Sequence, residues 1–162
     1  SVSEIKLPES GICQIIVGGS EKEGYKIFFG IDGKENREAL LRKMGERYKI
    51  NFTDDEIKRF TVINTFGVGM NQMKAFIAMK NEERTKPENI IGIPTDSLNN
   101  QLKDWVRYAR EVSPNMKIAI KGDKGTPYPE FKKVLNTLLD INENRFNLIT
   151  GLEENPEDKA SK

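Results

Sequence analysis

Apolar and polar residues alternate in two neighbouring stretches near the start of the chain. Residues 12–17 (ICQIIV) and residues 25–31 (YKIFFGI) each place every second apolar side chain on one face, which is typical of β-strands. The residues between them, 18–24 (GGSEKEG), are of the kind that form turns. The pattern predicts an antiparallel hairpin over residues 12–31.

Further along the chain, apolar residues recur every three or four positions, which is the period of an α-helix. A first stripe consists of Leu40, Leu41, Met44 and Tyr48. A second consists of Leu98, Leu102, Trp105, Val106, Ala109 and Val112, and a third of Phe131, Val134, Leu135, Leu138 and Leu139. Each stripe predicts one amphipathic helix. Thr53 and Glu56 have the spacing of a capping box, which predicts another helix start.

Two more alternating stretches, 117–121 (KIAIK) and 145–150 (RFNLIT), predict strands near the end of the chain. Hairpin and crossover units that share one sheet bury these stripes best in an α+β fold. We therefore expect a two-layer sandwich, in which a small mixed β-sheet carries helices on one face, with a mainly helical insertion. Residues 1–10 are predicted to be an extended linker, 11–150 the domain with its insertion at 45–97, and 151–162 a disordered tail.

Composition excludes several kinds of chemistry. The chain has no histidine, which removes Ser-His, Cys-His and His-metal mechanisms, and its single cysteine, Cys13, rules out an intrachain disulfide. A formal net charge of +1 disfavours nucleic-acid binding by bulk electrostatics. No apolar run approaches the roughly 20 residues that span a bilayer. The chain begins at Ser1 with neither methionine nor signal peptide, so we expect a portion of a longer gene product.

Three carboxylates near predicted turns, Asp96, Asp123 and Glu130, are the candidates for acid–base hydrolysis or for a hard cation. Their sequence positions put them on separate elements. Asp123 is more simply a turn former, and Asp96 beside Ser97 a helix N-cap. Trp105 and Cys13 lie in apolar stripes and are predicted to be buried. No residue pattern predicts a metal or another cofactor, and we expect a protein that is not an enzyme.

A binding role for the backbone remains. A small sheet has two strand edges, and an extended peptide can add to either of them through main-chain hydrogen bonds. The sequence alone does not choose between the edges.

Residues 117–150 (KIAIKGDKGTPYPEFKKVLNTLLDINENRFNLIT) resemble the signature segment of the ExbD/TolR family of biopolymer-transport proteins. That segment has an apolar strand, a Lys-x-Asp-x-x-x-x-Pro-Tyr-like turn, an amphipathic helix and a short final strand. The family-motif turn is here formed by Lys121, Asp123, Pro127 and Tyr128, although Pro127 follows Asp123 after three residues. Residues 12–44 resemble the family's opening hairpin and first helix, and SVSEIKLPES its linker, while 45–97 resemble an insertion of the kind seen in Bacteroidetes members.

The resemblance implies a function that the residue chemistry does not supply. Members of this family have one membrane-spanning helix with an essential aspartate, form a homodimer inside an ExbB pentamer, and use the proton-motive force to drive TonB and nutrient import. This chain lacks that helix, so it would be the periplasmic part of a single-pass inner-membrane protein, coupling through protein binding. The partner-binding candidates at the two ends of the domain are Ile5, Leu7, Ile15, Arg145, Asn147, Leu148 and Thr150.

Two alternatives stay open. A TolR-like subunit would act in envelope integrity and bind peptidoglycan, for which Lys103, Arg107 and Arg110 are the basic candidates. A carboxylate hydrolase would use Asp96 and Asp123.

Overall fold

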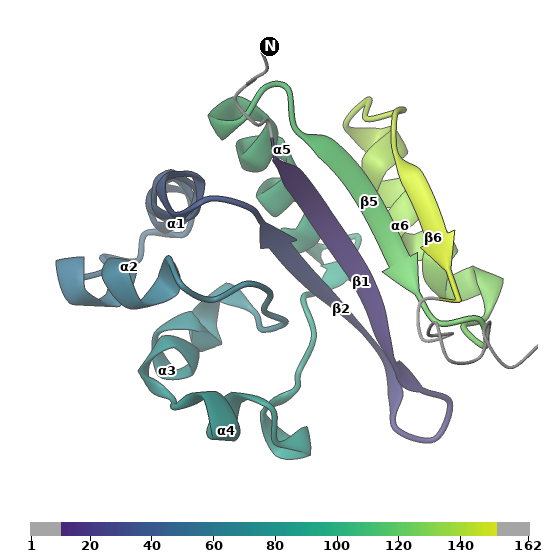
Figure 1. The fold of residues 1–162 in the computed structure, drawn as a ribbon, viewed down its shortest axis with the longest axis horizontal. Helices are drawn as coiled ribbons and strands as arrows, with labels where there is room; N and C mark the ends of the chain where they lie inside the picture. The colour runs from purple at the N-terminus through teal and green to yellow at the C-terminus, as the bar shows by residue number, and fades with distance from the viewer. Residues whose placement is uncertain (1–10, 152–162) are drawn as a thin grey trace, which may run out of the picture.

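The predicted hairpin forms part of a mixed β-sheet in the computed structural model, which describes residues 11–151. β1 (Ile12–Ser20) pairs antiparallel with β2 (Gly24–Ile31) and, on its other side, parallel with β5 (Lys117–Gly122). β5 pairs parallel with β6 (Asn147–Thr150). The strand order is therefore β2-β1-β5-β6, with β2 and β6 at the edges (Figure 1).

The three longest helices are those that the apolar stripes predicted. They are α1 (Lys34–Tyr48), α5 (Gln101–Val112) and α6 (Tyr128–Asp140). Figure 1 shows α5 and α6 behind the sheet, while no helix crosses the front of β1, β5 and β6. α1 packs against α5. The α+β class and the placement of helices on one face of a mixed sheet are confirmed.

The inserted region contributes short helices and covers one edge of the sheet. It contains α2 (Asp54–Phe60), α3 (Met73–Ala78) and α4 (Asn81–Arg84), with single 3-10 turns η2 (Met70–Gln72) and η3 (Pro87–Asn89). Phe66 exchanges two backbone hydrogen bonds with Phe29, of 2.8 and 2.9 Å, and the Ile93 amide donates to Ile27. The outer edge of β2 is therefore occupied by the insertion.

The sheet and the insertion share one hydrophobic core. Trp105 is fully buried, as the sequence predicted, and its ring lies 5.7 Å from Phe29 of the sheet. The same ring lies 6.3 Å from Phe60 and 4.6 Å from Phe66, both from the insertion. Cys13 is also buried as predicted, and burial raises the pKa of its thiol. Residues 45–97 therefore contribute to the same hydrophobic core as the sheet.

The start of α5 differs from the sequence prediction. Residues 95–100 form a small hairpin of β3 (Thr95–Asp96) and β4 (Asn99–Asn100), which leaves Leu98 97% exposed and outside the helix. The predicted N-cap at Asp96 is wrong: its Oδ1 accepts amides within the hairpin turn, and Asn100 caps α5 by accepting the Lys103 amide at 3.0 Å. Leu98 has the spacing of a helix residue, but spacing alone cannot show that a hairpin precedes the helix.

The capping box before α2 is confirmed. The Glu56 amide donates to Thr53 Oγ1 at 3.1 Å, and the Thr53 amide donates to Glu56 Oε1 at 2.8 Å. Two of the amides at the helix start are thus satisfied by side chains.

Candidate partner-binding edge

The last strand, β6, carries most of the predicted partner-binding residues. Asn147, Leu148 and Thr150 lie in it, and Arg145 immediately precedes it. β6 pairs with β5 on one side, and no residue within 11–151 pairs with its other side. Because β2 is covered by the insertion, β6 is the sheet edge at which the described chain offers unpaired backbone groups.

The side chains of β6 suit a partner that adds along the strand. Leu148 lies opposite the fully buried Ile120 of β5, yet it is 46% exposed because no strand follows β6 on that side. Ile149 is half-buried, and Asn147 and Thr150 are exposed. An apolar side chain at an open edge can be covered by a neighbouring strand while the main chain supplies the hydrogen bonds.

The N-terminal candidates have a different outcome. Ile15 is fully buried, and β1 is a central strand with partners on both sides, so neither its side chain nor its backbone is available to a partner. The prediction that Ile15 binds a partner is therefore wrong. Ile5 and Leu7 lie outside the described residues.

A pair of charged side chains fixes the loop that leads into β6. Arg110, near the end of α5, binds Glu143 through two hydrogen bonds of 2.9 and 2.8 Å, and these bonds raise the pKa of its guanidinium. A third nitrogen, Nη1, donates to the carbonyls of Pro114 and Met116, just before β5. Arg110 therefore ties the β6 loop to the start of β5. Sequence analysis did not find this pair because its members are 33 residues apart.

A cleft of about 370 Å³ lies at this end of the sheet. Arg110, Lys117 and Arg145 contribute to its lining, together with Phe146 and Asn147. Arg145 is exposed here beside the first residue of β6. The edge strand β6 thus begins at a cleft that is lined by basic side chains.

The motif turn begins in β5, where Lys121 lies opposite Ile149 of β6, and leads into α6. Lys121 reaches across to β1, where its Nζ donates to Gln14 Oε1 at 2.9 Å. Asp123 Oδ1 accepts the Thr126 hydroxyl at 2.9 Å, which closes the turn. Pro127 holds the cap position of α6, and Tyr128 is its first residue, 60% exposed. The four motif residues therefore have structural contacts in the connection between β5 and α6.

A tight contact in this turn was not anticipated from the sequence. A Cβ at Gly122 would lie 2.5 Å from the ring of Phe131 in α6, so only glycine allows the strand and helix to approach this closely. Gly122 lies opposite Thr150 of β6. The close packing of α6 therefore helps to position the end of the edge strand.

The candidate carboxylates are each held in a local interaction. Asp96 accepts amides in the β3–β4 turn, Asp123 accepts Thr126, and Glu130 accepts Lys133 Nζ at 2.9 Å on α6. They lie on three different elements. Among residues 11–151, no three His, Cys, Asp or Glu side chains are grouped so as to hold a metal ion.

Two of the three basic candidates for peptidoglycan are paired within the chain. Lys103 lies 3.6 Å from Asp140, and Arg110 binds Glu143. Arg107 is exposed. The helix α5 thus presents less uncompensated charge than its sequence indicates.

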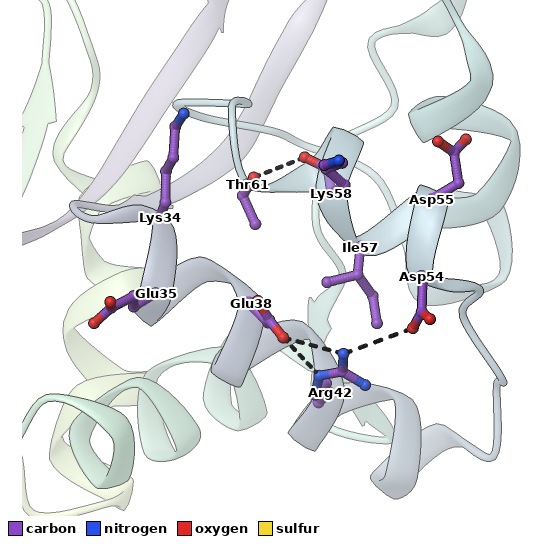
Figure 2. A pocket seen from close by; sticks show the side chains of 9 residues that line it. All are labelled: Lys34, Glu35, Glu38, Arg42, Asp54, Asp55, Ile57, Lys58 and Thr61. Atoms are coloured by element: carbon purple, nitrogen blue, oxygen red, sulfur yellow. Dashed lines mark hydrogen bonds and ion pairs between the residues drawn. The ribbon is translucent and has the colours of Figure 1, made fainter.

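A hollow of about 710 Å³ lies between α1 and α2 and was not expected from the sequence (Figure 2). Charges of both signs line it, and Arg42 stands between Glu38 at 3.0 Å and Asp54 at 3.9 Å. Ile57 is its one large apolar lining residue. The Arg42 pairs are solvent-exposed, and exposed ion pairs of this kind contribute little to stability.

Comparison with known proteins gave no match: no family model, no curated protein and no solved structure is similar to this chain. Membership of the ExbD/TolR family therefore stays a prediction from the residues. Among the helices described in residues 11–151, none is long and apolar enough to cross a membrane.

Proposed function

We propose that this chain is the periplasmic part of an ExbD/TolR-type subunit, which couples proton flow across the inner membrane to TonB-dependent nutrient import. In this proposal the domain works by binding proteins, and it breaks no covalent bond. The observation that carries the proposal is the edge strand β6, whose outer side is unpaired by the described chain.

Two features support this reading. The resemblance covers the hairpin at the front and residues 117–150 at the back, and these two parts lie side by side in one sheet through the β1–β5 pairing. The C-terminal end of the edge strand, where Thr150 lies opposite Gly122, adjoins the motif turn. The most family-like segment and the open edge thus belong to one continuous surface.

The edge can serve two of the expected partners. An extended segment of TonB could add to β6 in either direction, and a second copy of the chain could add its own β6 to form the homodimer. The contact with an ExbB-like pentamer would involve the membrane helix that the family possesses, and not these residues.

The proposal is tested by NMR titration of the labelled domain with the periplasmic region of TonB from the same genome. We expect amide shifts along 145–150, and we expect Leu148→Glu to weaken binding at least about tenfold, because the charge replaces apolar burial at the edge. Leu139→Glu is the matched control, since Leu139 is 58% exposed but lies on α6.

Shifts that leave residues 145–150 unchanged would reject the edge as the TonB site. Sedimentation of the same variants tests the homodimer. If Leu148→Glu leaves the association constant of the chain unchanged while Leu139→Glu lowers it, the dimer forms elsewhere.

A further inference from the structure

An apolar groove of about 380 Å³ lies at the opposite edge of the sheet, where the insertion meets β2. Phe28 of β2 contributes to it. The other apolar side chains that line it come from the insertion, and they are Val62, Ile63, Phe66, Phe76 and Ile90. Val62 is 59% exposed although valine is apolar, so the groove continues onto the surface.

One cation lines this groove. Arg84 donates from Nε to the Phe76 carbonyl at 3.0 Å and from Nη2 to the Ile77 carbonyl at 2.9 Å, and its guanidinium lies 5.4 Å from the centre of the Phe76 ring. A third bond, of 2.8 Å, goes from Nη1 to Asn81. These contacts hold the guanidinium at a fixed place beside the apolar surface.

A second guanidinium lies close to the first. Arg59 donates to the same Ile77 carbonyl, at 3.2 and 3.1 Å, and to Ala78. The carbonyls at the end of α3 partly offset the two charges, as they do at any helix C-terminus. Neither arginine makes an ion pair with a carboxylate anywhere in residues 11–151. Partial burial and the charge of Arg59 lower the pKa of Arg84, although it stays protonated at neutral pH.

Glu82 and Glu83 lie on α4, the helix that also carries Arg84, but within residues 11–151 neither forms an ion pair with it. Within residues 11–151, no Asp or Glu lines the groove. Its polar lining there consists of amides and hydroxyls, from Asn64, Thr65, Asn81, Thr85 and Asn89, besides Arg84. Glu83, on α4, uses its Oε1 to accept the Lys80 amide at 3.1 Å. The groove thus combines apolar walls with positive charge and offers no negative charge of its own.

We propose that this groove binds an extended segment of a partner protein in which a large apolar side chain is followed closely by an Asp or Glu. The apolar side chain would pack on Phe28 and on the exposed Val62, and the carboxylate would take the remaining donors of Arg84. Apolar anchors beside an arginine are typical of the energetic centre of a protein interface. The proposal assigns a role to the insertion and does not depend on the proposed function, because it uses the other edge of the sheet.

The test uses three blocked tetrapeptides, Gly-Phe-Asp-Gly, Gly-Phe-Asn-Gly and Gly-Phe-Lys-Gly, titrated into the labelled domain at low salt. We expect the Asp peptide to shift the amides of Gly67 and Ile90 and to bind at least about fivefold more tightly than the Asn peptide, with the Lys peptide weakest. The preference should shrink as salt is added, because exposed charges are screened. Trp105 fluorescence gives a second signal, since its ring contacts Phe66.

Variants then locate the site. Val62→Glu should weaken binding of the Asp peptide at least about tenfold, because it adds a negative charge at the groove. Ile91→Glu is the matched control, since Ile91 is 46% exposed but does not line the groove, and it should change affinity less than about twofold. Arg84→Gln should remove the preference for Asp over Asn; a thermal scan of each variant checks that it folds.

Several outcomes overturn the proposal. These are equal binding of the three peptides, no shifts at Gly67 and Ile90 up to about 10 mM peptide, or equal losses from Val62→Glu and Ile91→Glu. Binding that Leu148→Glu abolishes, and Val62→Glu does not, would place the peptide on β6. That result rejects the groove without rejecting the proposed function.

Discussion

Asp104 is a charged side chain placed almost entirely inside the protein. It is 8% exposed, accepts the Tyr48 hydroxyl at 2.5 Å, and lies 3.6 Å from Arg47 Nε. The two partners come from α1, whereas Asp104 belongs to α5. A buried carboxylate costs free energy unless it is hydrogen-bonded, so this contact helps to hold α1 against α5.

Removing the Tyr48 hydroxyl should therefore destabilise the domain. We expect Tyr48→Phe to lower the free energy of unfolding by about 1–3 kcal/mol at pH 7, because Asp104 keeps its burial and loses a donor. Urea denaturation measures the change. Tyr128→Phe is the control, since Tyr128 is 60% exposed, and should change stability by less than about 0.5 kcal/mol. Equal effects would contradict the role given to this hydrogen bond.

The same contact predicts a dependence on alkaline pH. Burial, and next the hydrogen bond to Asp104, raise the pKa of Tyr48 above its ordinary value. In the unfolded chain Tyr48 loses its proton near pH 10, so its contribution to stability is complete below that pH and declines above it. The stability difference between the wild type and Tyr48→Phe should thus be constant from pH 7 to 9 and smaller at pH 10.5. Urea denaturation at these pH values tests this; an unchanged or growing difference would refute it.

At the scale of elements, the edge strand β6 depends on a few contacts. It has four residues and one neighbouring strand, and its loop is tied down by the Arg110–Glu143 pair. Glu143 is well covered, with a side chain 13% exposed. Hydrogen bonds between such charged groups contribute more than those between exposed ions.

We therefore expect Glu143→Gln to loosen β6 locally. The free energy of unfolding should fall by about 1.5–3 kcal/mol, and the amides of Leu148 and Ile149 should exchange at least about tenfold faster. Hydrogen exchange followed by NMR measures both. Glu111→Gln is the control, because Glu111 pairs with Lys43 at 3.3 Å on the surface and its side chain is 58% exposed. If both variants exchange alike at β6, the Arg110–Glu143 pair does not hold the strand.

At the scale of the whole molecule, the insertion and the sheet share one hydrophobic core. Phe60 and Phe66 contact the same tryptophan as Phe29 of the sheet. Neither part can lose these rings without exposing Trp105. We therefore expect the domain to unfold in a single transition.

Phe60→Ala tests whether the domain unfolds in a single transition. The side chain is 1% exposed, so its removal should cost about 3–5 kcal/mol and shift the whole transition. Near-UV circular dichroism, which includes the single Trp105, and far-UV circular dichroism should report the same midpoint. Val62→Ala, at an exposed position, should leave the midpoint nearly unchanged. A two-step curve, with helices lost before the sheet, would show that the insertion folds separately.

The sequence by itself determined the local elements and the fold class. Alternation and helical periodicity depend on which face of a single element is buried, and for the hairpin, α1, α6 and the capping box that information is complete within a few neighbouring residues. The apolar spacing wrongly placed Leu98 in the helix. The β3–β4 hairpin, rather than the spacing, sets where α5 begins.

Only the tertiary structure decided which strand edge is open and where charges meet. β2 is covered because Phe66 and Ile93 return to it from distant positions, and Ile15 is enclosed because β5 joins β1 across about a hundred residues. The Arg110–Glu143 pair and the groove around Arg84 likewise join segments whose separation carries no periodic signal. Such contacts are fixed by the packing of the whole chain, and a local pattern holds no information about them.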